Sequence, residues 1–434
     1  MLEECPVILP LQKVDSTYSH TLCRGEGIYI YDEHGKRYID AISGLWNMPL
    51  GYNNQLINDS IMKQLEKLAY TNLNSGVADI TLTYARKLIS YFKGDFNKLI
   101  YSCSGSEALE VAIKVCRKYQ SLIGRRQRRK IGAFDLSYHG TTYGAMSISG
   151  IDAPLVEDYK PLIDGVAWIK TPYDRWRSVE IWLSNIQEFF DANKEELAGV
   201  IIEPIIGSGG ILEVPREAME LMRKLCTENN VLLVLDEVAT GFGRTGKMFA
   251  YEYSNIKGDL LCLSKAINNG YLSMGVTLIS PQIIEVLRNN QAHIEHFSTQ
   301  NGNPLACAAA YKTLEILSQN KQIIEGVTEK GEYFVAQLKH KLKNRFVEFE
   351  IRHKGLMIGI EIRGKQNKRV RGDALEECLN NLEKRGLLVY LFVTEVGTLG
   401  FSLFPSYLIS NEEIDNIVDV FSNVINKYIF KEIT

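Results

Sequence analysis

The fold of this 434-residue chain is decided by one stretch, Val231-Leu232-Leu233-Val234-Leu235-Asp236-Glu237-Val238. Five consecutive apolar residues without alternation predict a strand covered on both faces, which is typical of the parallel sheet in α/β proteins. Asp236 would then end a buried strand, where open α/β sheets place their ligands. Because a buried carboxylate needs a partner that offsets its desolvation, Asp236 is either a cap or ion-pair residue or part of a ligand site.

A lysine ends a second apolar run further along the chain, Asp259-Leu260-Leu261-Cys262-Leu263-Ser264-Lys265. Desolvation lowers the pKa of an amine and leaves it nucleophilic, which suits Schiff-base chemistry. Most lysines that follow strands point into solvent, so Lys265 alone is weak evidence for a functional site. The presence of Asp236 at the end of another buried strand strengthens it. A protonated pyridine nitrogen is one candidate partner for Asp236, with Lys265 near the aldehyde of the same ring, as in sites for pyridoxal phosphate (PLP).

Length and composition describe an ordinary soluble protein of two or three domains. The chain is 45% apolar and 23% charged, and its net charge of −3 gives no reason to expect nucleic acid or an acidic membrane as a partner. One basic cluster, Arg125-Arg126-Gln127-Arg128-Arg129-Lys130, is predicted to be a solvated loop, with contact to an anionic partner as the alternative.

The eight cysteines are scattered and include no Cys-x-x-Cys pair, so we expect small core residues in a reducing compartment and no metal site. The first residues show no basic segment followed by an apolar stretch, and no apolar run approaches the roughly 18 residues of a membrane span. We therefore expect a cytoplasmic protein without a membrane partner.

Strands and helices are expected to alternate from about residue 61 onward. The candidate strands are Lys98–Tyr101, Lys130–Phe134, Val166–Ile169, Gly199–Ile202, Val231–Leu235, Leu260–Leu263 and Val276–Ile279. Helical patterns fill most of the intervals, which favours a mainly parallel seven-stranded sheet with right-handed crossovers.

The two chain ends have a different character. Residues 1–60 are rich in turns and contain a predicted hairpin over Gly27–Asp40. After Pro304 a long helix-forming stretch runs to about Leu342, and then come a strand over Gly355–Ile362 and a terminal helix over Asn411–Tyr428. We predict a large α/β domain over residues 61–304 and a small α+β domain built from residues 1–60 and 305–434.

A turn that suits a phosphate opens one predicted helix, Ser104-Gly105-Ser106-Glu107. Ser104 and Glu107 match a capping box, and a plain helix start explains them sufficiently. Alternatively, Gly105 permits close backbone approach, and the free N–H groups with the Ser104 and Ser106 hydroxyls bind phosphate. Because Gly-x-Gly-x-x-Gly and the Walker pattern are absent here, a small phosphorylated cofactor is favoured over a dinucleotide or nucleoside triphosphate.

Further candidates follow other predicted strands. Tyr138 is placed to stack on a flat ring with His139 supporting it, although such a pair is more often loop or core packing. Val238 is placed to close the opposite face, or is simply a core residue. Glu203 and Arg244 precede or occupy glycine-rich turns, and we expect them to pair near the site unless they serve only the turns themselves.

In order and spacing, these residues resemble the class-III aminotransferases, the ω-transaminase branch of the fold-type-I PLP enzymes. The likeness spans nearly the whole chain. It rests on Ser-Gly-Leu-Trp at 43–46, Ser-Gly-Ser-Glu at 104–107, Tyr-His-Gly at 138–140, Glu-Pro-Ile at 203–205, Asp-Glu-Val at 236–238, Gly-Phe-Gly-Arg-Thr-Gly at 241–246, Ser-Lys-Ala at 264–266 and Ser-Thr-Gln-Asn-Gly-Asn-Pro at 298–304. No single motif is specific, but the set is.

The resemblance implies a role for each matched residue. Lys265 would hold PLP as a Schiff base and act as general base, and Asp236 would pair with the pyridine nitrogen. The phosphate would be bound by Gly105 and Ser106, and by Thr299 from a neighbouring subunit. Tyr138 would lie against the ring with Val238 behind it, and Trp46 would line the substrate pocket. The family also implies a homodimer with shared active sites.

Two positions depart from the family. Tyr390 stands where many relatives carry an arginine that holds a substrate carboxylate, and Ala239 stands where many carry a glutamine. An α-carboxylate would lack its planar two-donor partner. We therefore expect at least one substrate to be an amine, aldehyde or ketone without that group, or a larger molecule, unless Arg24, Arg352 or Arg363 supplies the missing contact.

Three functions are compatible with these residues. The leading one is a ping-pong aminotransferase that takes an amino group from an amine or amino-acid donor to a carbonyl acceptor. An aminomutase that moves an amino group within one molecule is the nearest alternative. A catalytically silent relative that serves as a scaffold is the third, although the site motifs are all present.

Overall fold

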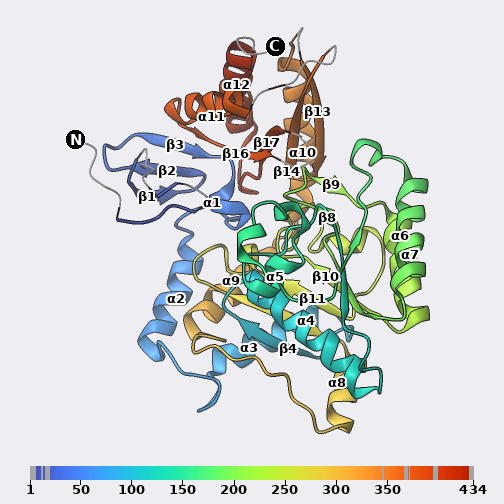
Figure 1. Ribbon diagram of the computed structural model, residues 1–434. Coiled ribbons are helices and arrows are strands. Elements are labelled where there is room, and N and C mark those ends of the chain that lie inside the picture. The colour runs from blue at the N-terminus through green and yellow to red at the C-terminus, as the bar shows by residue number, and fades with distance from the viewer. Residues whose placement is uncertain are drawn as a thin grey trace.

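A seven-stranded sheet forms the centre of the computed structural model, which describes residues 6–10, 13–14, 20–344, 347–365, 370, 372–393 and 399–429. Its strand order is β4-β12-β11-β10-β7-β5-β6 (Figure 1). The strands are β4 (Lys98–Ser102), β5 (Lys130–Phe134), β6 (Val166–Ile169), β7 (Leu197–Ile202), β10 (Leu232–Asp236), β11 (Leu260–Leu263) and β12 (Gly275–Ile279). All seven predicted strands are confirmed, and β12 alone among them runs antiparallel to both of its neighbours.

The central strand β10 is buried on both faces, as its unbroken apolar run predicts. Leu232 and Val234 pack in one core cluster with helix α4 (Gly105–Leu122), whereas Leu233 and Leu235 belong to the cluster on the other face. Alternate side chains of a strand point to opposite faces, so both clusters draw on the same five residues. Helices α6 (Val179–Asn193) and α7 (Arg216–Asn229) pack against each other, and they contact the edge strand β6 and the central strand β10 respectively.

A second group of elements gathers in the upper part of Figure 1 and contains segments from near both chain ends. One sheet has the order β1-β2-β3-β15 and the other β13-β14-β17-β16. The bounds are β1 (Leu22–Glu26), β2 (Tyr29–Asp32), β3 (Arg37–Asp40), β13 (Val347–Lys354), β14 (Met357–Gly364), β15 (Leu387–Leu388), β16 (Tyr390–Val393) and β17 (Leu399–Leu403).

The predicted hairpin is confirmed, since β2 and β3 pair antiparallel. Strand β15 then adds parallel to β3, so one sheet joins segments that are far apart in the sequence. This pairing supports a small domain built from both chain ends. The domain limits 1–60, 61–304 and 305–434 stay a proposal.

The helix-forming stretch after Pro304 differs from the prediction of one long helix. It divides into α9 (Pro304–Gln319) and α10 (Lys321–Lys341) at Asn320, whose φ of −110° and ψ of 68° are not helical. The Asn320 side chain donates to the Ile316 carbonyl at 2.9 Å. Such local side-chain bonds compete with helical geometry, which explains a break at this residue.

The terminal helix α12 (Asn411–Tyr428) has the predicted bounds and starts with a capping box of Ser410 and Glu413. The predicted strand at Gly355 starts later, because Gly355 has a φ of +55° and lies in the turn before β14. The remaining helices and short strands are α1 (Ser43–Trp46), α2 (Gln55–Lys67), α3 (Asp79–Tyr91), α5 (Tyr143–Ser147), α8 (Pro281–Asn289), α11 (Gly372–Lys384), β8 (Ile205–Ile206) and β9 (Leu212–Glu213).

The described part of the chain contains no helix long and apolar enough to cross a membrane. Within the same ranges no group of His, Cys, Asp and Glu side chains is arranged to hold a metal ion. The seven described cysteines are free, and Cys5 lies outside the described residues.

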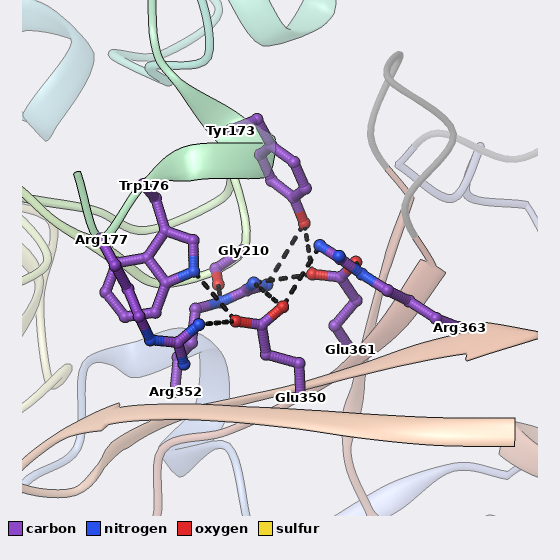
Figure 2. Close-up of polar contacts among 8 residues, drawn as sticks. All are labelled: Tyr173, Trp176, Arg177, Gly210, Glu350, Arg352, Glu361 and Arg363. Atoms are coloured by element: carbon purple, nitrogen blue, oxygen red, sulfur yellow. Dashed lines mark hydrogen bonds and ion pairs between the residues drawn. The ribbon is translucent and has the colours of Figure 1, made fainter. Parts of the chain in front are cut away.

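A buried network of charged side chains joins the β13–β14 hairpin to Gly210 and to residues 173–177, which follow β6 (Figure 2). Arg352 of β13, which is 3% exposed, donates to Glu361 at 2.7 Å and to the Gly210 carbonyl at 2.6 Å. Tyr173 also donates to Glu361 at 2.7 Å. Charges buried this deeply are tolerated because they are paired and hydrogen-bonded.

Glu350 forms the outer half of this network (Figure 2). Its carboxylate accepts hydrogen bonds from Trp176 at 3.0 Å and Arg177 at 2.7 Å, and it lies 3.2 Å from Arg363. Arg363 also bonds Glu361. The β13–β14 hairpin thus contributes two carboxylates and two arginines. Together they bind Tyr173, Trp176 and Arg177 of the segment that follows β6.

Replacing Arg352 by Ala is expected to lower the free energy of unfolding by about 3 kcal/mol, because the buried Glu361 carboxylate loses one of its two arginine partners and the Gly210 carbonyl loses its donor. The control is Arg216→Ala, which breaks an exposed pair with Glu220 and should cost much less, because solvent screens that pair. Urea-induced unfolding of both variants measures the difference. Equal losses in the two variants would contradict the assigned role of the network.

Candidate active site

The candidate site lies where three central strands end opposite the first turn of α4. Asp236 is the last residue of β10, Glu203 follows β7, and Lys265 follows β11. These ends enclose a hollow of about 140 Å³. Its lining residues are Trp46, Gly105, Ser106, Tyr138, His139, Gly140, Glu203, Ser208, Asp236, Val238, Ala239, Ser264 and Lys265. Most of the residues predicted for the site are therefore brought together, although they come from distant parts of the sequence.

Lys265 is the one lysine or arginine among these lining residues. Burial lowers the pKa of its amine, while the negative charges of Asp236 and Glu203 act in the opposite direction. The backbone at Lys265 has a φ of +45°, a left-handed conformation that side-chain-bearing residues seldom adopt. Its Nζ lies 4.5 Å from the centre of the Trp46 ring. A depressed pKa leaves more of the amine in the neutral, nucleophilic form.

Asp236 is held by two contacts and is 4% exposed. Its Oδ2 lies 2.7 Å from Nδ1 of His139, and its Oδ1 accepts a hydrogen bond from the Val238 amide at 3.0 Å. His139 is buried too, and its Nε2 has no hydrogen-bond partner within the described structure. His139 therefore fixes the orientation of the Asp236 carboxylate. The sequence predicted only a general supporting role for this histidine.

The first turn of α4 differs in one detail from the predicted capping box. The Ser104 hydroxyl accepts from the Glu107 amide at 3.1 Å, as predicted, but the Glu107 carboxylate accepts from the Cys103 amide at 2.8 Å. The box is therefore not reciprocal, because the carboxylate reaches one residue further back. Ser104 caps the helix and does not line the hollow, whereas Gly105 and Ser106 do.

Two glycines shape this end of the hollow. A Cβ atom on Gly105 would lie 2.9 Å from Val238 Cγ1. Gly140 has a φ of +124°, and a Cβ atom there would lie 2.0 Å from the Ser106 hydroxyl oxygen. A close-packed cradle at a helix N-terminus, with a serine hydroxyl beside it, fits a phosphate group.

The donor set fits PLP as a whole. Phosphate donors, the Asp236 carboxylate for a pyridine N–H and the Lys265 amine all line the same hollow. Tyr138 and Val238 both line it, as required for residues on the two faces of a ring.

Glu203 does not pair with Arg244, so that expectation is wrong. The Glu203 carboxylate accepts from the Tyr138 and Gly207 amides, both at 3.1 Å, and burial raises its pKa to about 7. The buried Arg244 guanidinium donates to the carbonyl of Pro405 at 2.6 Å and that of Leu356 at 3.3 Å. Arg244 therefore joins its glycine-rich turn to the C-terminal segment, whereas Glu203 holds the turn that carries Ser208.

Trp46 is positioned by a strained turn. Ser43, Gly44 and Trp46 have φ values of 49°, 71° and 63°. The buried carboxylate of Asp40 accepts from the Gly44 amide and from the Tyr52 hydroxyl, each at 2.5 Å. Sequence reasoning missed Asp40, although an acid just before a Ser-Gly turn is a signal for such a contact.

Trp46 lines the hollow and packs against two further aromatic residues, Tyr390 and Phe404, which do not line it themselves. The Trp46 ring stacks on Phe404 with centroids 4.1 Å apart and meets Tyr390 of β16 edge-on at 5.8 Å. Burial raises the pKa of both Tyr138 and Tyr390, and the negative charge of Asp152 raises both further. Asp152 was not predicted, and its own pKa is raised by burial.

None of the three arginines considered as substitutes for Tyr390 lines the hollow. Arg352 and Arg363 belong to the network of Figure 2. Arg24 is exposed, pairs with Glu26 at 3.2 Å and lies over the Tyr31 ring. The missing carboxylate-binding cation is therefore not replaced from these positions.

Thr299 does not line the hollow of its own chain. It is exposed, and its carbonyl accepts from the Tyr70 hydroxyl at 2.7 Å. Its neighbour Phe297 is 55% exposed.

Comparison with known proteins gives the family. The model of "Aminotransferase class-III" matches residues 12–425. The chain is 31% identical to adenosylmethionine-8-amino-7-oxononanoate aminotransferase of Staphylococcus aureus, over 93% of this chain and 91% of that protein. It is 33% identical to acetylornithine aminotransferase of Caldanaerobacter subterraneus, over 95% and 96%. A solved transaminase from the marine bacterium Virgibacillus superposes with a TM-score of 0.91 and 26% identity, covering 98% of this chain and 97% of that chain.

The chain therefore belongs to the class-III aminotransferases and has the fold of the fold-type-I PLP transaminases. Its activity is PLP-dependent amino transfer, as the sequence predicted, and the aminomutase and scaffold alternatives are not favoured.

Proposed function

We propose that this aminotransferase acts on an amine donor and a carbonyl acceptor of which at least one lacks an α-carboxylate. The observation that carries the proposal is the set of ionisable residues in the hollow, where Lys265 is the one lining lysine or arginine and Glu203 and Asp236 are lining acids. A substrate carboxylate would enter without an arginine to receive it, and would meet the Trp46 ring, which packs against Tyr390 and Phe404.

The proposed roles follow from position and charge. PLP supplies a ring that accepts electrons from a substrate carbon. The Asp236 carboxylate keeps a proton on the ring nitrogen, and His139 holds that carboxylate at 2.7 Å. The Lys265 amine, with its pKa lowered by burial, binds the cofactor at rest and then moves a proton at Nζ. Gly105 and Ser106 bind phosphate, while Tyr138 and Val238 enclose the ring.

The position of Asp152 supports the proposal that a substrate is cationic. Its carboxylate is half-buried and raises the pKa of both Tyr138 and Tyr390, so it lies within electrostatic reach of the substrate end. A negative charge there favours an incoming ammonium group and opposes an incoming carboxylate.

The transamination test uses PLP-loaded protein and an aromatic or aliphatic primary amine. Without an acceptor, carbonyl product is expected to stop at about one equivalent per site, because the cofactor then holds the amino group. Adding an aldehyde or ketone is expected to restore turnover. Turnover of a single substrate with no acceptor would instead indicate an aminomutase, and no product at all would indicate a silent relative.

The substrate proposal is tested by a donor panel that contrasts simple amines with alanine and glutamate. Simple amines are expected to react at least tenfold faster than alanine and glutamate. Tyr390→Arg is expected to reduce this rate ratio, because the arginine restores a partner for the substrate carboxylate. Tyr390→Phe is the matched control. Rapid reaction of alanine or glutamate in the wild type, lost in Tyr390→Phe, would overturn the proposal.

We also propose a cytoplasmic homodimer in which Thr299 of one subunit completes the phosphate site of the other. The exposed Thr299 and Phe297 support this arrangement, because a partner surface would cover both. Light scattering is expected to give a mass near twice the 49.1 kDa of the chain, and a single-chain mass would contradict the dimer.

A further inference from the structure

Five basic side chains line a second hollow, of about 630 Å³, that lies away from the active site. They are Lys114, Arg117, Lys118, Arg126 and Arg129. The first three lie on the outer part of α4, and the two others come from the loop between α4 and β5. We call this feature the basic hollow.

The loop between α4 and β5 holds the basic cluster of the sequence, and the structure divides it. Arg128 turns inward, where it is 8% exposed and donates to the Asn229 carbonyl, and Lys130 pairs with Glu196 at 2.9 Å. Only Arg126 and Arg129 turn toward the hollow. The prediction of a fully solvated loop is therefore wrong for Arg128.

The protein balances the charge of the basic hollow only in part. Five cations and one acid, Glu295, line it, and Asp164 acts on Arg117 from nearby. Among the described residues, none of the five cations forms an ion pair with a carboxylate, whereas some exposed cations elsewhere do, such as Lys67 with Asp79 at 2.5 Å and Arg216 with Glu220 at 2.7 Å. The one acid in the lining, Glu295, instead lies 3.2 Å from His293.

Neutral carbonyl groups hold three of the cations in place. Arg117 donates to the carbonyls of Arg129 at 3.0 Å and Asp164 at 2.6 Å. Lys114 donates to the Glu295 carbonyl at 3.1 Å, and Arg129 to that of Arg126 at 3.3 Å. These bonds fix the side chains without cancelling their charges, so like charges stay close together at a cost in free energy.

We propose that the basic hollow binds a small anion that carries phosphate groups. Arginine and lysine donors in one concave site suit phosphate oxygens, and an anion would remove the repulsion between the cations. The volume falls within the range of small-molecule sites, about 300–1,000 Å³. The chain as a whole carries a net charge of −3, which disfavours a long polyanion such as nucleic acid.

The test is calorimetric titration of PLP-saturated protein with tripolyphosphate at low ionic strength, so that the active site is already filled. The variant Lys118→Gln/Arg126→Gln removes two charges from the basic hollow. The control Lys321→Gln/Arg385→Gln removes two exposed charges elsewhere. Wild type and control are expected to bind one anion per chain, and the hollow variant at least tenfold more weakly, with salt weakening all binding.

Parallel titrations with ATP identify the source of the phosphate. Tighter binding of ATP than of tripolyphosphate supports a nucleotide, and equal binding supports phosphate groups alone. The proposal is overturned if tripolyphosphate does not bind, or if both double variants bind it equally. It is also overturned if the hollow variant halves the mass in solution, since the cations would then be subunit contacts, or if single-stranded RNA binds more tightly as its length increases.

Discussion

The proposed active site depends on one buried acidic side chain, the Asp236 carboxylate at the end of β10. Burial of a lone carboxylate is costly, so its neighbours must offset that cost. His139 at 2.7 Å and the Val238 amide at 3.0 Å do so, and they also fix its direction. A carboxylate held this way can keep a proton on the cofactor ring, which is what makes the lowered pKa of Lys265 useful for chemistry.

The same constraint shapes the substrate end. Asp236 and Glu203 line the hollow, and Lys265 is its one lining lysine or arginine. Binding of a substrate carboxylate there is therefore disfavoured. Arg352 and Arg363 of the β13–β14 hairpin are paired with Glu350 and Glu361, where they join two parts of the molecule. Because Arg352 and Arg363 form these ion pairs, they contribute to stability and are not free to bind a substrate carboxylate.

Much of this was predictable where the signal is local. The apolar run before Asp236, the Ser-Gly-Ser helix start and the alternation of strands and helices each lie within a short stretch, and the structure bears them out. The pairing of Glu203 with Arg244 failed because Arg244 bonds Pro405 and Leu356, which lie far along the chain. Asp152 was missed for the same reason, since tertiary structure brings it near Tyr138 and Tyr390. The Asp40 contact to Gly44 is local, and so is the place of Ser208 in the turn after Glu203, so both were missed although the sequence carried their signal.

Covalent attachment of PLP to Lys265 is tested by borohydride reduction of the loaded protein, followed by digestion and mass spectrometry of the peptides. We expect a single modified peptide that contains Lys265, and no modified peptide from Lys265→Ala. A cofactor fixed to another lysine, or catalytic turnover retained in Lys265→Ala, would contradict it.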